Sequence, residues 1–563
     1  MGDAVIIRGG SATVIMPPLQ NGAVEFPLDG ANAVAGPDTS AATQEHDSDA
    51  IARAVIYHLR GDNAAALQAL LAIKPADRTV DLLASLGYIQ TELGQFEAAA
   101  TSYAQVTDKQ PASADAWFQW GFCLYRIGQT ADAAQRFDRA SALRPDWIEA
   151  PLARAICQLR LKQYQKAFEH ADECLALNPA YAPALFAKAV TFHVIWEFDQ
   201  ALTYYRQSLD ASPNCLEVLM NLITLGLQQK RFDIVRQYSE QLIELEGDVP
   251  LAVEGIAISA FNAGDYPTAA SKFARLVELA PDQVANWLNL GVACERQAQY
   301  GEAVAAFTKA RQLRPDSLYA HTYLGGALWK SGDLAAARAC YEQAVAKWPE
   351  KEDLTLNLAQ ILDDLGDFHE AEKVCSEFCA RDGNQRQVWF RLGHSQFQLN
   401  DWESAAYSFE RAVKLQPDWP DAEVNLALAY YMAAKYEESE TVLRRLLETE
   451  PEHPEALKGL ATVVLARGRH EEALSLHEKV LRIGGPDPDA YYNCGVLAHK
   501  LGHADRAAAF YRQAISIRPT FAEALLNLGH ALMNLGDERE AHTSWVSALE
   551  LRPEFARAYF RRS

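Results

Sequence analysis

A residue that ends helices returns every 34 positions along most of this 563-residue chain. Proline lacks the backbone N–H that a helix needs, and glycine takes the left-handed cap conformation at little cost. Proline stands at residues 111, 145, 179, 213, 281, 315, 349, 417, 451, 519 and 553, and glycine replaces it at residues 247, 383 and 485. This fixed period predicts one array of short helical repeats rather than several separate globular domains.

The spacing of residues inside one period identifies the type of repeat. In residues 114–147, Trp117, Gly121, Ala133, Phe137 and Pro145 stand at positions 4, 8, 20, 24 and 32. This pattern resembles the tetratricopeptide repeat, a helix–turn–helix element of 34 residues. The resemblance covers residues 80–555 as fourteen tandem repeats. It implies an all-α, right-handed superhelical solenoid.

The two ends of the chain depart from the array. Residues 1–47 lack a helical period and contain short β-prone runs, so we expect an extended N-terminal segment. Two interpretations of this segment stay open: a leader with little structure, or an extended apolar ligand for the array. Residues 48–79 have Ala65 at position 20 but little else of the pattern, which indicates a degenerate capping repeat. Residues 556–563 are expected to begin a truncated terminal helix.

Two residue types alternate at fixed positions of the first helices. In this family the first helix of each repeat lines the concave face, and position 6 looks inward. Position 6 holds Asn221, Asn289, Asn357, Asn425 and Asn493 at intervals of 68 residues, and Asn527 as well. Position 12 holds rings in the intervening repeats, among them Phe261, Trp329 and Phe397. An asparagine amide offers one acceptor and two donors, so it can pair with both the N–H and the C=O of an extended peptide.

This row is similar to the asparagine ladder in the tetratricopeptide arm of O-GlcNAc transferases, which implies that these nine residues bind a peptide. A simpler interpretation also stays open, because asparagine is common at position 6 of ordinary tetratricopeptide repeats and rings at position 12 can pack between repeats. The row fails toward the N-terminus, where position 6 holds Ser85, Gln119, Ala153 and Ala187. We therefore expect a peptide along residues 216–555. The repeat 216–249 departs most from the pattern.

Composition and motifs exclude several classes of function. A net charge of −22 disfavours nucleic acid and anionic membranes as partners. No apolar run is long enough to span a membrane, and no signal peptide is seen, so we expect a cytoplasmic protein, with export by a non-standard route left open. Phosphate-loop, H-E-x-x-H and nucleophile-elbow motifs are absent, so we expect no catalytic residue and no cofactor. Cys375 and Cys379 lack further ligands, so we expect no metal site.

The sequence thus predicts a non-catalytic scaffold that binds an extended peptide or a partner protein along the concave face. One alternative is a self-assembling subunit, in which residues 1–47 dock on a neighbouring copy and extend a head-to-tail oligomer or filament. A second alternative is the regulatory arm of a glycosyltransferase.

Overall fold

The structure, a computed structural model, describes residues 15, 16, 18 and 41–556. Over these residues the secondary structure is helical, with no strand, which confirms the predicted fold class. The helices are α1 Ala41–Leu59, α2 Asn63–Leu71, η1 Pro75–Asp77, α3 Val80–Glu92, α4 Phe96–Lys109, α5 Ala114–Arg126, α6 Thr130–Leu143, α7 Glu149–Arg160, α8 Tyr164–Leu177, α9 Ala182–Val194, α10 Phe198–Ala211, α11 Leu216–Gln228, α12 Phe232–Glu246, α13 Pro250–Asn262, α14 Tyr266–Leu279, α15 Val284–Arg296, α16 Tyr300–Leu313, α17 Leu318–Lys330, α18 Leu334–Lys347, α19 Glu352–Asp364, α20 Phe368–Arg381, α21 Arg386–Gln398, α22 Trp402–Leu415, α23 Pro420–Met432, α24 Tyr436–Thr449, α25 Pro454–Ala466, α26 His470–Gly484, α27 Pro488–Lys500, α28 Ala504–Ile517, α29 Ala522–Leu535 and α30 Glu538–Leu551.

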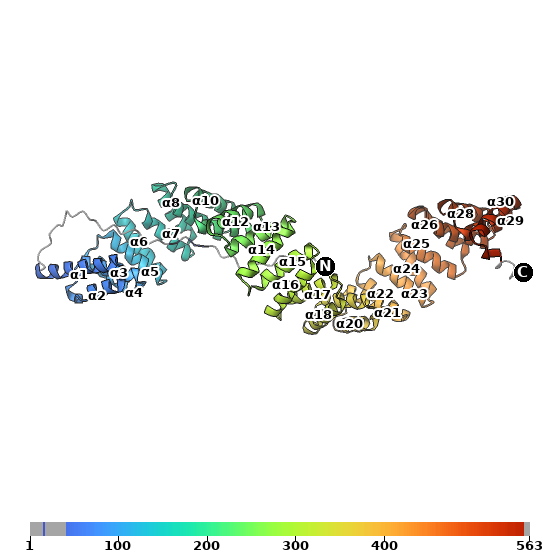
Figure 1. Cartoon of the computed structure of the whole chain (residues 1–563), viewed down its shortest axis with the longest axis horizontal. Helices are drawn as coiled ribbons and strands as arrows, with labels where there is room; N and C mark the ends of the chain where they lie inside the picture. The colour runs from blue at the N-terminus through green and yellow to red at the C-terminus, as the bar shows by residue number, and fades with distance from the viewer. Residues whose placement is uncertain (1–14, 17, 19–40, 557–563) are drawn as a thin grey trace. The chain divides into compact units, whose positions relative to one another are not determined.

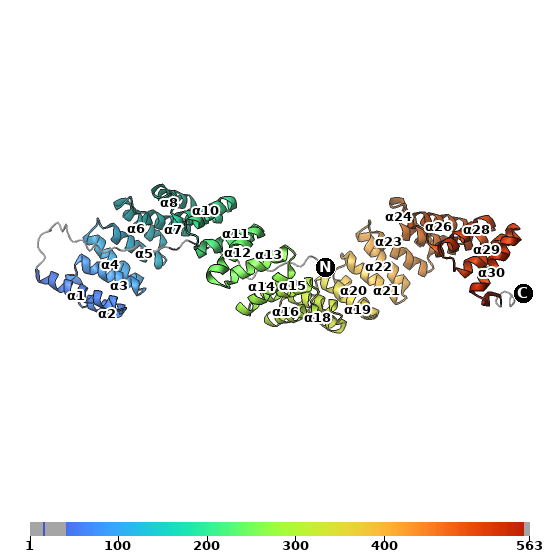
Figure 2. The same ribbon diagram turned by 45° about the horizontal axis from the view of Figure 1, so that its top comes forward.

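From α3 onward the helices follow one another as consecutive pairs, one pair for each predicted repeat (Figures 1 and 2). The first helix begins at the predicted repeat start in every case except α7, which begins one residue later at Glu149. The turn between paired helices needs a left-handed residue, which is Gly128 in one repeat, with φ of 87°, and Trp196 in another, with φ of 71°. The first helices therefore begin with the same 34-residue period as the prolines and glycines of the sequence.

Small residues at position 8 let the two helices of a repeat approach closely. A Cβ atom added to Gly291 would lie 2.4 Å from the ring of Phe307 at position 24 of the same repeat. Real Cβ atoms do not approach carbon this closely, so the pair must be a small residue facing a large one. This contact joins a small residue at position 8 to a large one at position 24, two of the positions that identified the repeat.

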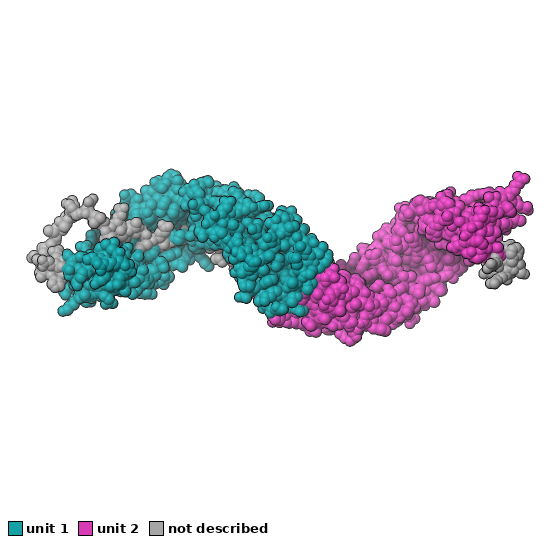
Figure 3. All heavy atoms as spheres, in the orientation of Figure 1, with its two compact units in different colours: residues 1–313 teal, residues 314–563 magenta. Residues whose placement is uncertain are grey.

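The chain divides into unit 1, residues 1–313, and unit 2, residues 314–563, which are coloured separately in Figure 3. Within each unit, successive first helices contact one another directly, as α11 contacts α13 in unit 1 and α19 contacts α21 in unit 2. No two successive second helices make contacts as extensive in the described chain. The first helices therefore lie on the tighter side of each stack, where the resemblance places the binding face.

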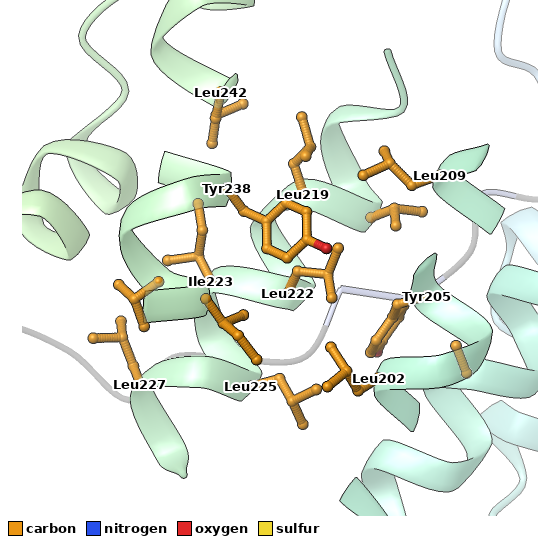
Figure 4. Packing of buried hydrophobic residues seen from close by; sticks show 14 of the residues in the cluster. Leu202, Tyr205, Leu209, Leu219, Leu222, Ile223, Leu225, Leu227, Tyr238 and Leu242 are labelled. Atoms are coloured by element: carbon orange, nitrogen blue, oxygen red, sulfur yellow. The ribbon is translucent and has the colours of Figure 1, made fainter. Parts of the chain in front are cut away.

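The repeat 216–249, expected to be the most irregular, lies inside a continuous apolar cluster that extends from α7 to α15. Ile223, labelled in Figure 4, and Val235 replace the usual small residues and are fully buried. Two glycines, Gly226 and Gly255, provide the room that these larger side chains need. A Cβ atom on Gly226 would lie 2.8 Å from Val235, and one on Gly255 would lie 2.3 Å from Ser239 Oγ. Large residues thus stand where small ones are usual, and glycines face them. The close packing is kept although the repeat pattern is not.

The N-terminal boundary needs a correction. Residues 41–47 are helical, as part of α1, so about two turns of the predicted extended segment 1–47 belong to a helix instead. Helix α1 packs against α2 and α3. Apart from Ala556, the predicted terminal helix 556–563 lies outside the described residues. No helix in the described part of the chain is long and apolar enough to cross a membrane.

Candidate peptide-binding site

Asn221, on α11, holds the backbone of a residue far away in the sequence. Its Oδ1 accepts a hydrogen bond from the N–H of Ile15 at 2.7 Å, and its Nδ2 donates to the carbonyl oxygen of Ile15 at 2.8 Å. The side chain of Asn221 is fully buried, and Ile15 is half-buried in a stretch that is neither helix nor strand. One amide thus satisfies both backbone groups of one residue, as a neighbouring strand does in an antiparallel sheet.

A chain of buried polar groups lies behind Asn221. The amide hydrogen bonds the hydroxyl of Tyr205, and burial raises the pKa of that hydroxyl well above its usual value. The same hydroxyl lies 3.1 Å from Nδ1 of His193, and Nε2 of His193 lies 2.9 Å from Oε1 of Gln228. Burial also lowers the pKa of His193, more than its bond to Gln228 raises it, so the ring is neutral.

One arrangement of protons satisfies every group in this relay. Because Gln228 Oε1 can only accept, Nε2 of His193 carries the proton and Nδ1 accepts from the Tyr205 hydroxyl. The Tyr205 oxygen then accepts from the second N–H of Asn221. The amide is thereby fixed with Oδ1 toward an N–H group and Nδ2 toward a carbonyl oxygen, the orientation that Ile15 requires.

The other asparagines of the predicted row lie in different surroundings. Asn289, on α15, is buried and only 1% exposed. Asn357, on α19, is half-buried, and its side chain makes no hydrogen bond within residues 41–556. Asn425, on α23, bonds back to the carbonyl oxygen of Asp421 at 2.7 Å, and Asn493, on α27, is exposed. Their role in peptide binding stays a prediction.

Asn527, on α29, contacts tyrosines of the preceding repeat. Its Nδ2 donates to the hydroxyl of Tyr492 at 3.1 Å, and its amide also hydrogen bonds Tyr511. Tyr511 stands at the same repeat position as Tyr205 does beside Asn221. The pairing of a tyrosine at position 24 with an asparagine at position 6 therefore occurs in both units.

The predicted rings at position 12 contact neighbours within the array. Phe261 lies edge-on to Tyr266, with ring centroids 5.3 Å apart, and Phe397 lies edge-on to Trp402 at 4.7 Å. In both repeats the partner is the first residue of the second helix, so these rings pack across the turn of their own repeat. Trp329 donates from Nε1 to Asp364 Oδ2 at 2.8 Å. Their contact with a peptide stays a prediction.

A polar network extends over α19 and α21 in unit 2. Arg391, at position 6 of its repeat, donates to Asp363 Oδ2 at 3.3 Å and also bonds Gln360 Oε1. Ser395 Oγ donates to Asp363 Oδ1 at 3.4 Å, and Gln360 donates to Asp364 at 2.9 Å. The polar groups beside Asn357 are thus engaged with one another.

The predicted row includes Asn221 but not the residues of the relay that contacts its amide. Neither His193, at position 12 of its repeat, nor Tyr205, at position 24, is among the predicted site residues. The signal that could have found them is the combination of hydrogen-bonding residues at positions 12 and 24 of one repeat with asparagine at position 6 of the next.

Comparisons with known proteins place the chain among repeat proteins. Models described as tetratricopeptide repeat match residues 255–317 and 324–386, and a second such model matches 90–156 and 498–559. A model described as the cytochrome c-type biogenesis protein H TPR domain matches residues 376–491. No curated protein matches the chain.

Several solved structures are similar. They include the APC/C hetero-tetramer Cut9-Hcn1, with 15% identity, 86% of this chain and 95% of that chain covered, and a TM-score of 0.31. YrrB, described as a TPR protein with an unusual peptide-binding site, has 20% identity, coverage of 33% and 96%, and a TM-score of 0.32. MamA has 21% identity, coverage of 31% and 96%, and a TM-score of 0.29. The family models and the helix pairs together show that this chain is built from tetratricopeptide repeats.

Proposed function

We propose that this chain is a non-catalytic scaffold that binds an extended peptide, or an extended segment of a partner protein, along its first helices. The observation that carries the proposal is the two-point pairing of Asn221 with the N–H and the C=O of Ile15. Both contacts are to backbone atoms, so the site accepts peptides of differing side chains. The direction of the amide is set by a buried relay rather than by the ligand, so it is present before a peptide arrives.

A comparison of backbone and side-chain changes tests this proposal. An array of immobilised random dodecapeptides is probed with the full-length chain, and peptides that bind are resynthesised with one N-methyl amide at a time or one alanine at a time. We expect one N-methyl position to abolish binding, while most alanine substitutions change affinity little. Binding that survives every N-methyl change but fails on alanine substitution would contradict a site that reads backbone.

The second candidate, a self-assembling subunit, is favoured by one specific observation: the residue held by Asn221 belongs to the same sequence. A second copy of the chain offers the same Ile15, so docking between copies uses the same contacts. Sedimentation velocity across a hundredfold range of concentration separates the two functions, because only self-assembly gives species that grow with concentration. The glycosyltransferase arm stays a prediction that no contact in the described residues favours.

A further inference from the structure

We infer that the chain carries its own ligand: the backbone of Ile15 occupies the Asn221 site within the same molecule, and an external peptide binds only by displacing it. This inference rests on the proposed function and deepens it, because it names the first occupant of the site. The class of external ligand follows from the occupant: an extended apolar segment with a free N–H and C=O at one residue.

Among residues 15, 16 and 18, which the structure describes, the contacts are concentrated at Ile15. Ile15 is half-buried and makes both hydrogen bonds to Asn221, whereas Met16 is 40% exposed and Pro18 is exposed. The next residue of an extended chain directs its N–H to the opposite side, and Met16 donates no hydrogen bond in the described part of the chain. The site therefore recognises a single backbone unit, which a different segment can supply equally well.

The covalent connection favours occupation by the chain itself. Ile15 and α1, which begins at Ala41, belong to one chain, so no translational freedom is lost when the segment binds. Tethered ligands reach effective concentrations of about the millimolar range. An external peptide with the same groups then competes against a resident ligand, and its apparent affinity falls in proportion to the fraction of sites left open.

The Asn221 amide also has no alternative hydrogen-bond partner that it could reach without a cost in free energy. Tyr205 holds one of its N–H groups, and its remaining donor and acceptor face the segment inside a fully buried position. If the segment left without replacement, both groups would lose their partners unless water entered. The site is thus expected to exchange one backbone for another rather than to stay empty.

The experiment uses full-length chains and a fluorescein-labelled peptide of residues 9–20, GGSATVIMPPLQ, followed by fluorescence anisotropy. Ile15→Pro in the chain removes the N–H that Asn221 accepts. Met16→Pro is the matched control, because it adds the same ring and removes an N–H that the site does not use. Thermal unfolding of each variant shows that the array is intact, and sedimentation velocity reports whether the chains are monomeric.

We expect the peptide to bind the Ile15→Pro chain at least about tenfold tighter than the wild-type chain, since tenfold corresponds to nine-tenths of sites being occupied internally. Met16→Pro should bind as wild type does, and Asn221→Ala in the Ile15→Pro chain should lose the peptide. Equal affinity for the wild-type and Ile15→Pro chains would overturn the inference while leaving the proposed function intact.

Two further results would overturn it. Wild-type oligomers that dissociate on Ile15→Pro substitution would show that the segment docks on a second copy. Failure of the 9–20 peptide to bind the Ile15→Pro chain, while array peptides bind, would show that this segment is not a ligand. If array peptides also fail, the proposed function itself falls.

Discussion

Tyr205 and Asn221 in unit 1 stand at the same repeat positions as Tyr341 and Asn357 in unit 2, yet only the first pair holds a peptide backbone among the described residues. The Tyr341 hydroxyl donates to the carbonyl oxygen of Thr322 at 3.1 Å, inside its own repeat. Asn357 is left half-buried beside a charged network. The two residue types are therefore not sufficient to make the site.

The difference begins at position 12. His193 offers Nδ1 as an acceptor, which draws the Tyr205 hydroxyl and leaves the tyrosine oxygen free to accept from the amide. Trp329, at the same position in unit 2, has no acceptor nitrogen and donates to Asp364 instead. Without an acceptor, Tyr341 turns to a main-chain carbonyl. A residue that never touches the ligand thus decides whether the amide is oriented.

The two regions also differ in charge, so their stability should respond differently to acid, which is the largest expected effect. Burial alone would raise the pKa of Glu440, on α24, but hydrogen bonds from Arg469 and Arg444 outweigh it and lower the pKa to about 2. Arg467 also bonds the same carboxylate, at 2.6 Å. The Asn221 relay is neutral, so it has no comparable group.

A carboxyl group whose pKa falls on folding stabilises the fold at pH values above its unfolded pKa. For Glu440 the unfolded pKa is near 4.5, and the stabilisation is lost as the pH falls through the folded value of about 2. We expect Glu440→Gln to cost about 3 kcal/mol at neutral pH and to flatten the pH dependence between these limits. Hydrogen exchange of α24–α26 measures both effects. Glu438→Gln, a change at an exposed neighbour, is the control. An equal loss of stability there would show that removing one negative charge matters, rather than the arginine network around Glu440.

The second prediction compares the two amides directly. In the Ile15→Pro chain, Asn221→Ala should weaken binding of the 9–20 peptide by about 30- to 150-fold, because two hydrogen bonds of about 1 to 1.5 kcal/mol each are lost. Asn357→Ala should change the affinity less than about twofold, within the scatter of neutral surface changes. Anisotropy titration provides the measurement. Comparable losses at both positions would mean that the peptide extends over unit 2 as the sequence predicted.

The third prediction tests the exchanged packing beneath Asn221. Gly255→Ala should destabilise unit 1 by about 1 to 3 kcal/mol, because its Cβ would lie 2.3 Å from Ser239 Oγ and 3.0 Å from Val235. Gly301→Ala, on α16, is the control: nothing lies within 4 Å, so it should be neutral or stabilising by about 0.5 to 1 kcal/mol. Urea unfolding gives both values, and a tolerated Gly255→Ala would mean that α12 and α13 can separate.

The sequence predicted the helix pairs almost to the residue, because proline, glycine and small residues act locally and recur every 34 residues. It also predicted that Asn221 could hold a peptide backbone. It could not separate Asn221 from Asn357, because the relay depends on which acceptor lies across a helix pair. Nor did the repeat pattern show that Ile223 and Val235 are well packed, since the compensating Gly226 and Gly255 stand outside positions 8 and 20, where the pattern places its small residues.

The last prediction isolates the relay from the amide itself. Tyr205→Phe removes the hydroxyl that holds one N–H of Asn221, so the amide loses its fixed orientation while both groups that meet Ile15 remain. We expect binding of the 9–20 peptide to the Ile15→Pro chain to weaken by about three- to tenfold, the value of one neutral hydrogen bond. Tyr341→Phe, at the same repeat position in unit 2, should leave the affinity unchanged, since its hydroxyl donates to the carbonyl oxygen of Thr322 inside its own repeat. Wild-type affinity in the Tyr205→Phe chain would show that packing alone orients Asn221. The difference between His193 and Trp329 would then not explain why, among the described residues, Asn221 holds a backbone and Asn357 does not.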